Sequence, residues 1–190
     1  MARKVSNKRE RLLKAADELF LQKGTDLTTL ADIAHASDVP LGNVYYYFKT
    51  KGAIVSDVIK LRFKELQELL SKIDQEQQSP ETQLKAFMQV FVNLTDSESQ
   101  NFGFMLTMLW IELGKEGGDL LKEFLPLPEY VLNWCQNKFN ALGKGEQAQQ
   151  YATNLLVSLY GLCVNRHNPV AQELIPSQIN FLTQTMGIAG

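Results

Sequence analysis

The sequence predicts an all-α protein with a basic N-terminal part, and three observations lead to that prediction. Apolar residues recur at helical spacing along the chain, without the alternation or the β-branched runs typical of strands. Of the 190 residues, 45% are hydrophobic, which is enough to bury one large core or two small ones. Residues 1–64 hold 12 Lys and Arg against seven Asp and Glu, a net charge of +5, whereas the rest of the chain holds seven against 14, or −7. A basic segment on an acidic protein favours binding to phosphate groups, and the alternative is a basic segment that is merely solvated.

Composition also excludes several classes of protein. Two cysteines, Cys135 and Cys163, are too few for a disulfide framework, and no CxxC or HxxxH spacing occurs, so we expect no metal and no cofactor. The first apolar stretch, residues 12–20, is broken by charges and does not form a signal peptide. The longest uncharged run, residues 147–165, carries amides and hydroxyls that a membrane span does not tolerate. We therefore expect a soluble, cytoplasmic protein without membrane contact.

Helical spacing and turn residues predict the order of elements in both halves of the chain. The N-terminal half is expected to contain a helix over 12–20 ended by Gly24, and then short helices over 30–36 and 40–48 around Ser37–Asp38, the first of them capped by Thr28–Thr29. A long helix capped by Thr50 and closing at 75–79 is expected next. The second half is expected to begin with a helix from Pro80 closed by 95–99 and a helix over 102–113, followed by a break at Gly117–Gly118. A connection with Pro126 and Pro128 should then lead into a helix over 130–142. Two final helices are expected to be joined by a turn at 165–168, with Pro176 in the first turn of the last helix.

A short helix, a turn and a second short helix within a basic segment indicate a helix-turn-helix, whose second helix enters the major groove of DNA. Leu30, Ile33 and Val44 have the spacing needed to pack the two helices together, and Asp38 tolerates the left-handed conformation of the turn. The residues left facing outward on the second helix are Leu41, Gly42, Asn43, Tyr45, Tyr46, Tyr47, Lys49 and Lys51. Tyrosines beside positive charge favour nucleic-acid contact over simple core packing at this site.

The same region carries a multi-part motif in order and at regular spacing over roughly the first quarter of the chain. Its parts are Arg11–Phe20 (RLLKAADELF), Gly24, Thr28, Ile33–Ala34, Val39–Phe48 (VPLGNVYYYF) and Lys51. This motif resembles the N-terminal signature of the TetR family of bacterial transcriptional regulators. The resemblance implies an N-terminal three-helix helix-turn-helix domain, placed at residues 1–52, and a helical effector-binding and dimerisation domain, placed at residues 53–190. Ser37–Asp38 departs from the Ala-Gly found in many members and puts a carboxylate near the turn.

The resemblance also assigns roles to residues of the DNA-binding set. Leu41, Gly42, Asn43 and Tyr46 are expected to read bases, with Asn43 suited to an adenine edge, and Tyr47 to contact bases or backbone. Thr28, Thr29, Tyr45 and Lys51 are expected to bind phosphates through hydroxyls, an ammonium group and helix N-termini. The full predicted set is Thr28, Thr29, Pro40, Leu41, Gly42, Asn43, Tyr45, Tyr46, Tyr47, Lys49 and Lys51.

The resemblance also implies that the second domain holds a small effector, which we expect to be apolar. Aromatic and Met side chains suited to such a pocket are Phe102, Met105, Met108, Trp110, Tyr130, Trp134 and Tyr160, with polar groups such as Glu112 and Asn133. The alternative is that these side chains only pack against one another. Cys135 and Cys163 are expected to be small buried apolar residues rather than thiol sensors, and His35 to lie on the surface. The last two helices are expected to form the interface of a homodimer, or else to pack within one chain.

Three hypotheses follow for function. The favoured one is a homodimeric repressor released from a palindromic DNA operator by a small hydrophobic effector. The second is a DNA-binding dimer regulated by a protein partner or without any small-molecule ligand. The third, a small helical enzyme, is disfavoured because the sequence offers no Gly-rich phosphate loop and no nucleophile elbow, so we expect no enzyme.

Overall fold

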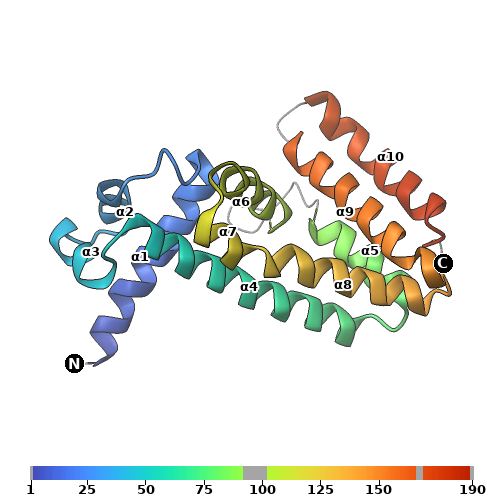
Figure 1. Cartoon of the computed structure of the whole chain (residues 1–190), viewed down its shortest axis with the longest axis horizontal. Helices are drawn as coiled ribbons and strands as arrows, with labels where there is room; N and C mark the ends of the chain where they lie inside the picture. Colours follow the sequence, from blue (N-terminus) through green and yellow to red (C-terminus); the bar gives the residue numbers. More distant parts are fainter. Residues whose placement is uncertain (1, 92–101, 166–168, 189–190) are drawn as a thin grey trace. The chain divides into compact units, whose positions relative to one another are not determined.

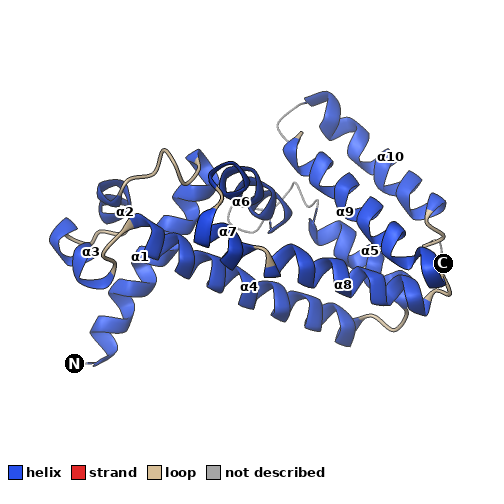
Figure 2. Ribbon diagram, viewed as in Figure 1, coloured by secondary structure: helices blue, strands red, loops and turns tan. Residues whose placement is uncertain are grey.

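The computed structural model describes residues 2–91, 102–165 and 169–188, except for the side chains of residues 2–7, 102, 105, 116 and 170–172. Every regular element in these ranges is helical, which confirms the all-α prediction (Figure 2). The helices, labelled in Figure 1, are α1 (Ala2–Lys23), α2 (Leu30–Ala36), α3 (Leu41–Tyr47), α4 (Lys51–Glu76), α5 (Pro80–Phe91), α6 (Phe102–Glu116), α7 (Gly118–Phe124), α8 (Pro126–Ala141), α9 (Ala148–Val164) and α10 (Pro169–Thr185), with a short 3₁₀ turn η2 (Gly145–Gln147). None of these helices is both long and apolar enough to cross a membrane.

The chain forms two compact units whose boundaries fall inside α4 and α6. The first unit joins Met1–Lys64 to Met108–Phe124, and the second joins Glu65–Thr107 to Leu125–Gly190. The first unit therefore contains the three N-terminal helices, the first half of α4, the end of α6 and all of α7. The predicted division into functional domains at residue 52 remains a prediction.

The first unit is built on one apolar face of α1. Leu12 and Ala16 on that face are fully buried, and Phe20 follows one turn later. Helix α1 contacts α2, and α2 contacts α3. Gly24 ends α1 with φ +84°, a left-handed conformation that favours glycine, as the sequence predicted.

A buried ion pair joins α1 to α4 within the first unit. The guanidinium Nε of Arg62 donates to Asp17 Oδ1 at 2.8 Å, and Nη2 donates to Oδ2. Both side chains are almost completely removed from solvent. An exposed pair, Arg9 with Asp57, links the same two helices nearer the start of α4. The bidentate geometry fixes the position of α4 along α1, because a guanidinium matches a carboxylate in only a few orientations.

The second unit is a packed group of helices in which α8 contacts α5 and α9, and α9 contacts α10 (Figure 1). Aromatic rings interlock at its centre: Phe87 lies 5.5 Å from Trp134, and Phe91 lies 5.4 Å from Tyr160, measured between ring centroids. The Trp134 indole also donates to the Asp74 carboxylate at 3.1 Å. These contacts give α5, α8 and α9 a common apolar core.

Two predictions that concern prolines were wrong, whereas the predicted break at Gly117–Gly118 is confirmed, since α6 ends at Glu116 and α7 begins at Gly118. The expected connection around Pro126 and Pro128 is helical: α7 ends at Phe124, and Pro126 is the first residue of α8. Proline is well suited to that first position, where its missing N–H has no intrahelical partner. Pro176 lies inside α10 rather than in its first turn, at an exposed position. The turn residues expected at 95–99 and 166–168 lie outside the described residues.

We predict that Arg62→Met lowers the free energy of unfolding by about 3 kcal/mol, because it leaves the Asp17 carboxylate buried without its partner. Urea denaturation followed by circular dichroism measures this change. The double variant Asp17→Leu, Arg62→Met should recover most of the loss, since it replaces both members of the buried pair with apolar side chains. As a control, Lys14→Met breaks the exposed pair between Lys14 and Glu18 and should change the same free energy by less than about 0.5 kcal/mol. Equal effects of Arg62→Met and Lys14→Met would contradict the prediction.

Candidate nucleic-acid interface

The N-terminus of α2 is fixed by a reciprocal cap. The Asp32 N–H donates to the Thr29 hydroxyl oxygen at 3.1 Å, while the Thr29 N–H donates to the Asp32 carboxylate at 2.8 Å. Lys23 at the end of α1 donates to the same carboxylate at 2.8 Å. The hydrogen bond from Lys23, followed by those from Thr29, holds the pKa of Asp32 far below its ordinary value. The predicted capping role of Thr29 is confirmed, and Asp32 and Lys23 join it.

The turn between α2 and α3 is held from α1. Asp38 adopts φ +51°, the left-handed conformation predicted for the turn. Arg11 donates to the Asp38 carbonyl at 2.8 Å and to its carboxylate at 3.0 Å, and also to the Ser37 carbonyl. The carbonyls at the C-terminal end of α2 thereby gain a cationic partner. The sequence had identified Arg11 as part of the motif but gave no sign of this role.

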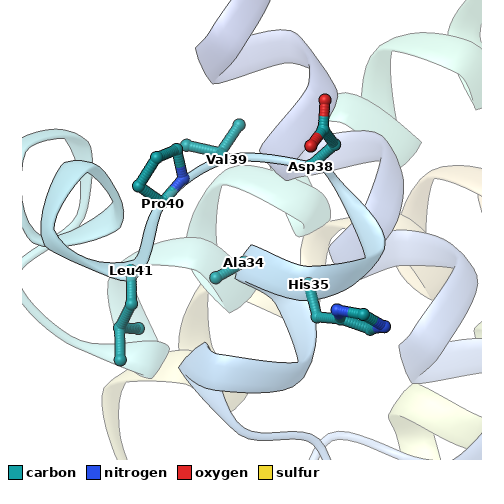
Figure 3. A pocket seen from close by; sticks show the side chains of 6 residues that line it. All are labelled: Ala34, His35, Asp38, Val39, Pro40 and Leu41. Atoms are coloured by element: carbon teal, nitrogen blue, oxygen red, sulfur yellow. The ribbon is translucent and has the colours of Figure 1, made fainter.

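An open cavity of about 340 Å³ lies beside this turn. Figure 3 shows the six residues that line it, with the Asp38 carboxylate pointing away from the His35 and Leu41 side chains. His35 is exposed, as expected. The turn therefore presents a surface that contains both the last turn of α2 and the first residue of α3.

Helix α3 buries one residue and exposes most of the others. Val44 is fully buried, and Val39 and Phe48 anchor the two ends of the helix. Tyr46 is 75% exposed and makes an edge-to-face contact with Tyr47, with ring centroids 5.1 Å apart. Exposed residues of the predicted set on or beside this helix are Pro40, Leu41, Gly42, Tyr45, Tyr46 and Lys49, whereas Asn43 and Tyr47 are partly exposed. The structure thus brings the predicted base-reading residues together on one short helix.

Gly42 has no structural requirement for glycine within the chain. A Cβ at this position would meet no atom within 4 Å, and its φ is not in the left-handed region. Glycine inside a helix lowers helix stability by about 1 kcal/mol relative to alanine. Its presence on the exposed side of α3 leaves room for close approach by another molecule.

Besides Thr29, whose N–H and hydroxyl are bound to Asp32, two more of the residues expected to bind phosphate have intramolecular partners. Thr28 is fully buried and its hydroxyl donates to the Gly24 carbonyl at 2.7 Å. Lys51 donates to the carbonyls of Thr25 and Asp26 at 2.8 and 3.2 Å. The side chain of Thr28 therefore faces the interior, and that of Lys51 holds the turn between α1 and α2.

Glu112 on α6 also holds that turn. Its Oε2 accepts from the Thr25 N–H at 2.7 Å and from the Thr25 hydroxyl at 2.6 Å. The sequence had suggested Glu112 as a polar group of the effector pocket, whereas the structure pairs it with Thr25. No local pattern reveals this contact, because 87 positions separate the two residues.

The residues expected to line an effector pocket are distributed over both units. Met108 and Trp110 belong to the first unit, where Trp110 is 47% exposed and lies 6.0 Å from Phe124 between ring centroids. Tyr130, Trp134 and Tyr160 belong to the second, where Trp134 and Tyr160 are part of its aromatic core. The side chains of Phe102 and Met105 lie outside the described residues. The cavity beside Asp38 contains none of these residues, so the pocket stays a prediction.

The second unit contains an amide-rich cavity of about 390 Å³ at the start of α9. It is lined by Glu146, Gln147, Gln150, Tyr151 and Asn154. None of the predicted pocket residues lies in its wall. Both cysteines are buried, as expected, and burial raises the pKa of the Cys135 thiol, which disfavours the reactive thiolate.

Comparison with known proteins gives a family match for the helix-turn-helix region. A family model described as "Bacterial regulatory proteins, tetR family" matches residues 12–58. The HTH-type transcriptional regulator QacR from Staphylococcus aureus is 33% identical over 66 residues, which are 35% of this chain and 35% of QacR. The chain thus matches about a third of the length of that relative.

Solved structures with the same fold extend over nearly the whole chain. A TetR transcriptional regulator from Legionella pneumophila superposes with a TM-score of 0.80, covers 93% of this chain and 96% of its own, and is 20% identical. AibR, solved in complex with isovaleryl coenzyme A and operator DNA, has a TM-score of 0.71, covers 92% and 97% of the two chains, and is 14% identical. At these identities the likeness concerns the fold.

We predict that the contribution of Asp32 to stability depends on pH. A carboxylate whose pKa is lowered on folding stabilises the folded state fully above its ordinary pKa, and the stabilisation is lost as pH falls from there toward the lowered value. The difference in thermal unfolding midpoint between the native protein and Asp32→Asn should therefore be constant above about pH 5 and shrink below about pH 4. A difference that stays the same from pH 6 to pH 3 would rule out the Lys23–Asp32–Thr29 cap as its source. The exposed Asp26→Asn serves as the control.

Proposed function

Since the chain belongs to the TetR family of bacterial regulatory proteins, we propose that it is a homodimeric transcriptional repressor that binds a palindromic DNA operator and is released by a small hydrophobic effector. The observation that carries the DNA-binding part is helix α3, which buries Val44 and leaves Leu41, Tyr45 and Tyr46 exposed. Exposure of these large side chains to water does not stabilise a helix of seven residues. Its exposed side is suited to entering the major groove.

The residues of the proposed interface divide by chemistry. The Asn43 amide can donate to and accept from an adenine edge, Leu41 can contact a thymine methyl group, and Gly42 allows close approach. Tyr45, Lys49 and the N-terminus of α2 at Thr29 are exposed, and we assign to them the contacts with phosphates, which position the protein without specifying sequence. We assign Thr28 and Lys51 to supporting these groups, because their polar atoms bind the turn between α1 and α2.

An exposed apolar stripe supports the proposed homodimer. Val157 and Val164 lie seven residues apart on α9, and Leu174 and Phe181 lie seven residues apart on α10, all four more than half exposed. Gly161, between the two valines, has an open position where a Cβ would touch nothing. Because α9 and α10 contact each other, a second copy can cover both stripes in a four-helix arrangement.

The effector is the part of the proposal with an open alternative. The aromatic and Met side chains predicted for the pocket are of the kind that lines a site for an apolar ligand, and AibR is a solved relative in fold whose complex contains isovaleryl coenzyme A. The interlocked rings of Phe87, Phe91 and Trp134 favour the alternative, a DNA-binding dimer regulated by a protein partner or without any small molecule. Release of the protein from operator DNA by hydrophobic compounds in a gel-shift assay separates the two.

We predict that selection from randomised duplex DNA enriches a palindrome with half-sites about 34–36 Å apart. Asn43→Ala should then weaken binding to that site by about tenfold or more and leave the dependence on salt unchanged, because it removes a base contact. Lys49→Ala is the matched control. It should weaken binding to all duplexes, and it should reduce the steepness of the plot of log binding constant against log salt concentration by about one unit. Enrichment of no site would reject the proposed function, and full specificity in Asn43→Ala would reject the assigned reader.

We also predict that Phe181→Lys converts the dimer into a monomer, because it places a charge in the apolar stripe. Sedimentation equilibrium over a range of concentrations measures the change. Gln67→Lys adds the same charge at an exposed position of α4 and should leave the dimer intact. A dimer that persists in Phe181→Lys would place the interface elsewhere.

A further inference from the structure

We propose that Glu112 is a positioning residue for DNA binding, which acts by holding the turn between α1 and α2 in the conformation that places α2 and α3. This inference rests on the proposed function. Glu112 lies on α6, far along the chain from the helix-turn-helix, and none of its contacts belongs to the expected DNA surface. Its two hydrogen bonds, at 2.7 and 2.6 Å, both go to Thr25 in that turn.

Two side chains of opposite charge hold the turn, one bound to a backbone N–H and the other to backbone carbonyls. The Glu112 carboxylate accepts from the Thr25 N–H, whereas the Lys51 ammonium donates to the carbonyls of Thr25 and Asp26. All three segments belong to the first compact unit. Hydrogen bonds to charged groups are stronger than neutral ones, and Thr25 is buried, so water is a poor substitute for either partner.

Gly24, the residue before Thr25, also lies close to Glu112. Its φ of +84° already favours glycine, and a Cβ built there would displace the Glu112 carboxylate. The backbone before Thr25 thus fits closely against the carboxyl group.

The turn leads directly into the α2 cap. The Thr28 N–H donates to the Thr25 carbonyl at 3.3 Å, and the Thr28 hydroxyl donates to the Gly24 carbonyl. Thr29 follows as the capping residue of α2, and α2 packs against α3. A turn released from Glu112 would therefore loosen the N-terminus of α2 and, through α2, the support of the exposed helix α3.

The direction of the effect distinguishes positioning from simple electrostatics. Removing a carboxylate from a DNA-binding unit should strengthen binding to DNA, because it reduces repulsion of the phosphates. Loss of positioning should weaken binding to the specific operator and leave binding to unrelated DNA unchanged. Glu18→Gln makes the same charge change on α1 of the same unit, where the side chain contacts only Lys14 among the ion pairs described, and serves as the matched control.

The experiment compares the native protein, Glu112→Gln and Glu18→Gln on the selected operator and on a scrambled duplex, by fluorescence anisotropy. We expect Glu112→Gln to bind the operator about tenfold more weakly, to bind the scrambled duplex as tightly as the native protein or slightly more tightly, and to exchange the Thr25 amide hydrogen at least tenfold faster. Glu18→Gln should bind the operator as well as the native protein or more tightly. Thr25→Val, which keeps the N–H but removes the hydroxyl, should weaken binding to the operator and not to the scrambled duplex. When it is combined with Glu112→Gln, it should weaken operator binding little further.

Each other result overturns the inference. Operator binding by Glu112→Gln that equals or exceeds native binding means that the contact does not position the helix-turn-helix. Equal loss on both duplexes, with a lowered fraction of active protein, means that Glu112 serves folding alone; if Glu112→Gln does not fold, Thr25→Val decides on the same criteria. A native protein that prefers no DNA sequence rejects the proposed function itself and this inference with it, whereas a native protein with an operator and an unaffected Glu112→Gln rejects this inference only.

Discussion

The buried ion pair between Asp17 and Arg62 is the contact on which the arrangement of the first unit depends. Two charges removed from water stabilise the fold only when they meet in good geometry, and each is costly without the other. The pair therefore favours one position of α4 along α1, and positions shifted along the helix are higher in free energy because they separate the two charges. Nonpolar contacts such as those of Leu12 and Ile54 are less selective, because apolar side chains repack with smaller losses. The position of Lys51, at the start of α4, follows from this constraint.

Helix α1 then acts as a frame for the shorter helices. Lys23 at its end binds the cap at the start of α2, and Arg11, about half of the helix earlier, binds the carbonyls at the end of α2. A helix of seven residues is too short to be stable alone in water, since nucleation costs more than its few hydrogen bonds return. The charged partners at both ends of α2 stabilise it, although the helix is short. Similar reasoning explains why α3 has its ends anchored by Val39 and Phe48.

The elements that the sequence predicted correctly depend on neighbours in the chain. The cap at Thr29, the left-handed Asp38 and the left-handed Gly24 are each determined by residues within four positions. The pairing of Glu112 with Thr25, and the inclusion of residues 108–124 in the first unit, depend on contacts between distant segments and left no local pattern. The error at Pro126 has another cause: proline ends a helix when it lies inside one but begins a helix equally well, and position alone decides between the two.

Under the proposed function, the contrast between the fixed frame and the exposed helix α3 has a thermodynamic reason. Each side chain or segment that must be ordered when DNA binds lowers the affinity by the entropy that is lost. In this unit the ordering is largely completed before binding, because α2 is held at both ends, its entry turn is held by Glu112 and Lys51, and α3 is anchored at Val44. The side chains left free are the ones suited to meeting bases. Binding energy from contacts such as those proposed for Asn43 and Tyr46 is then available for discriminating between DNA sequences, since little of it is spent on ordering α2 and α3.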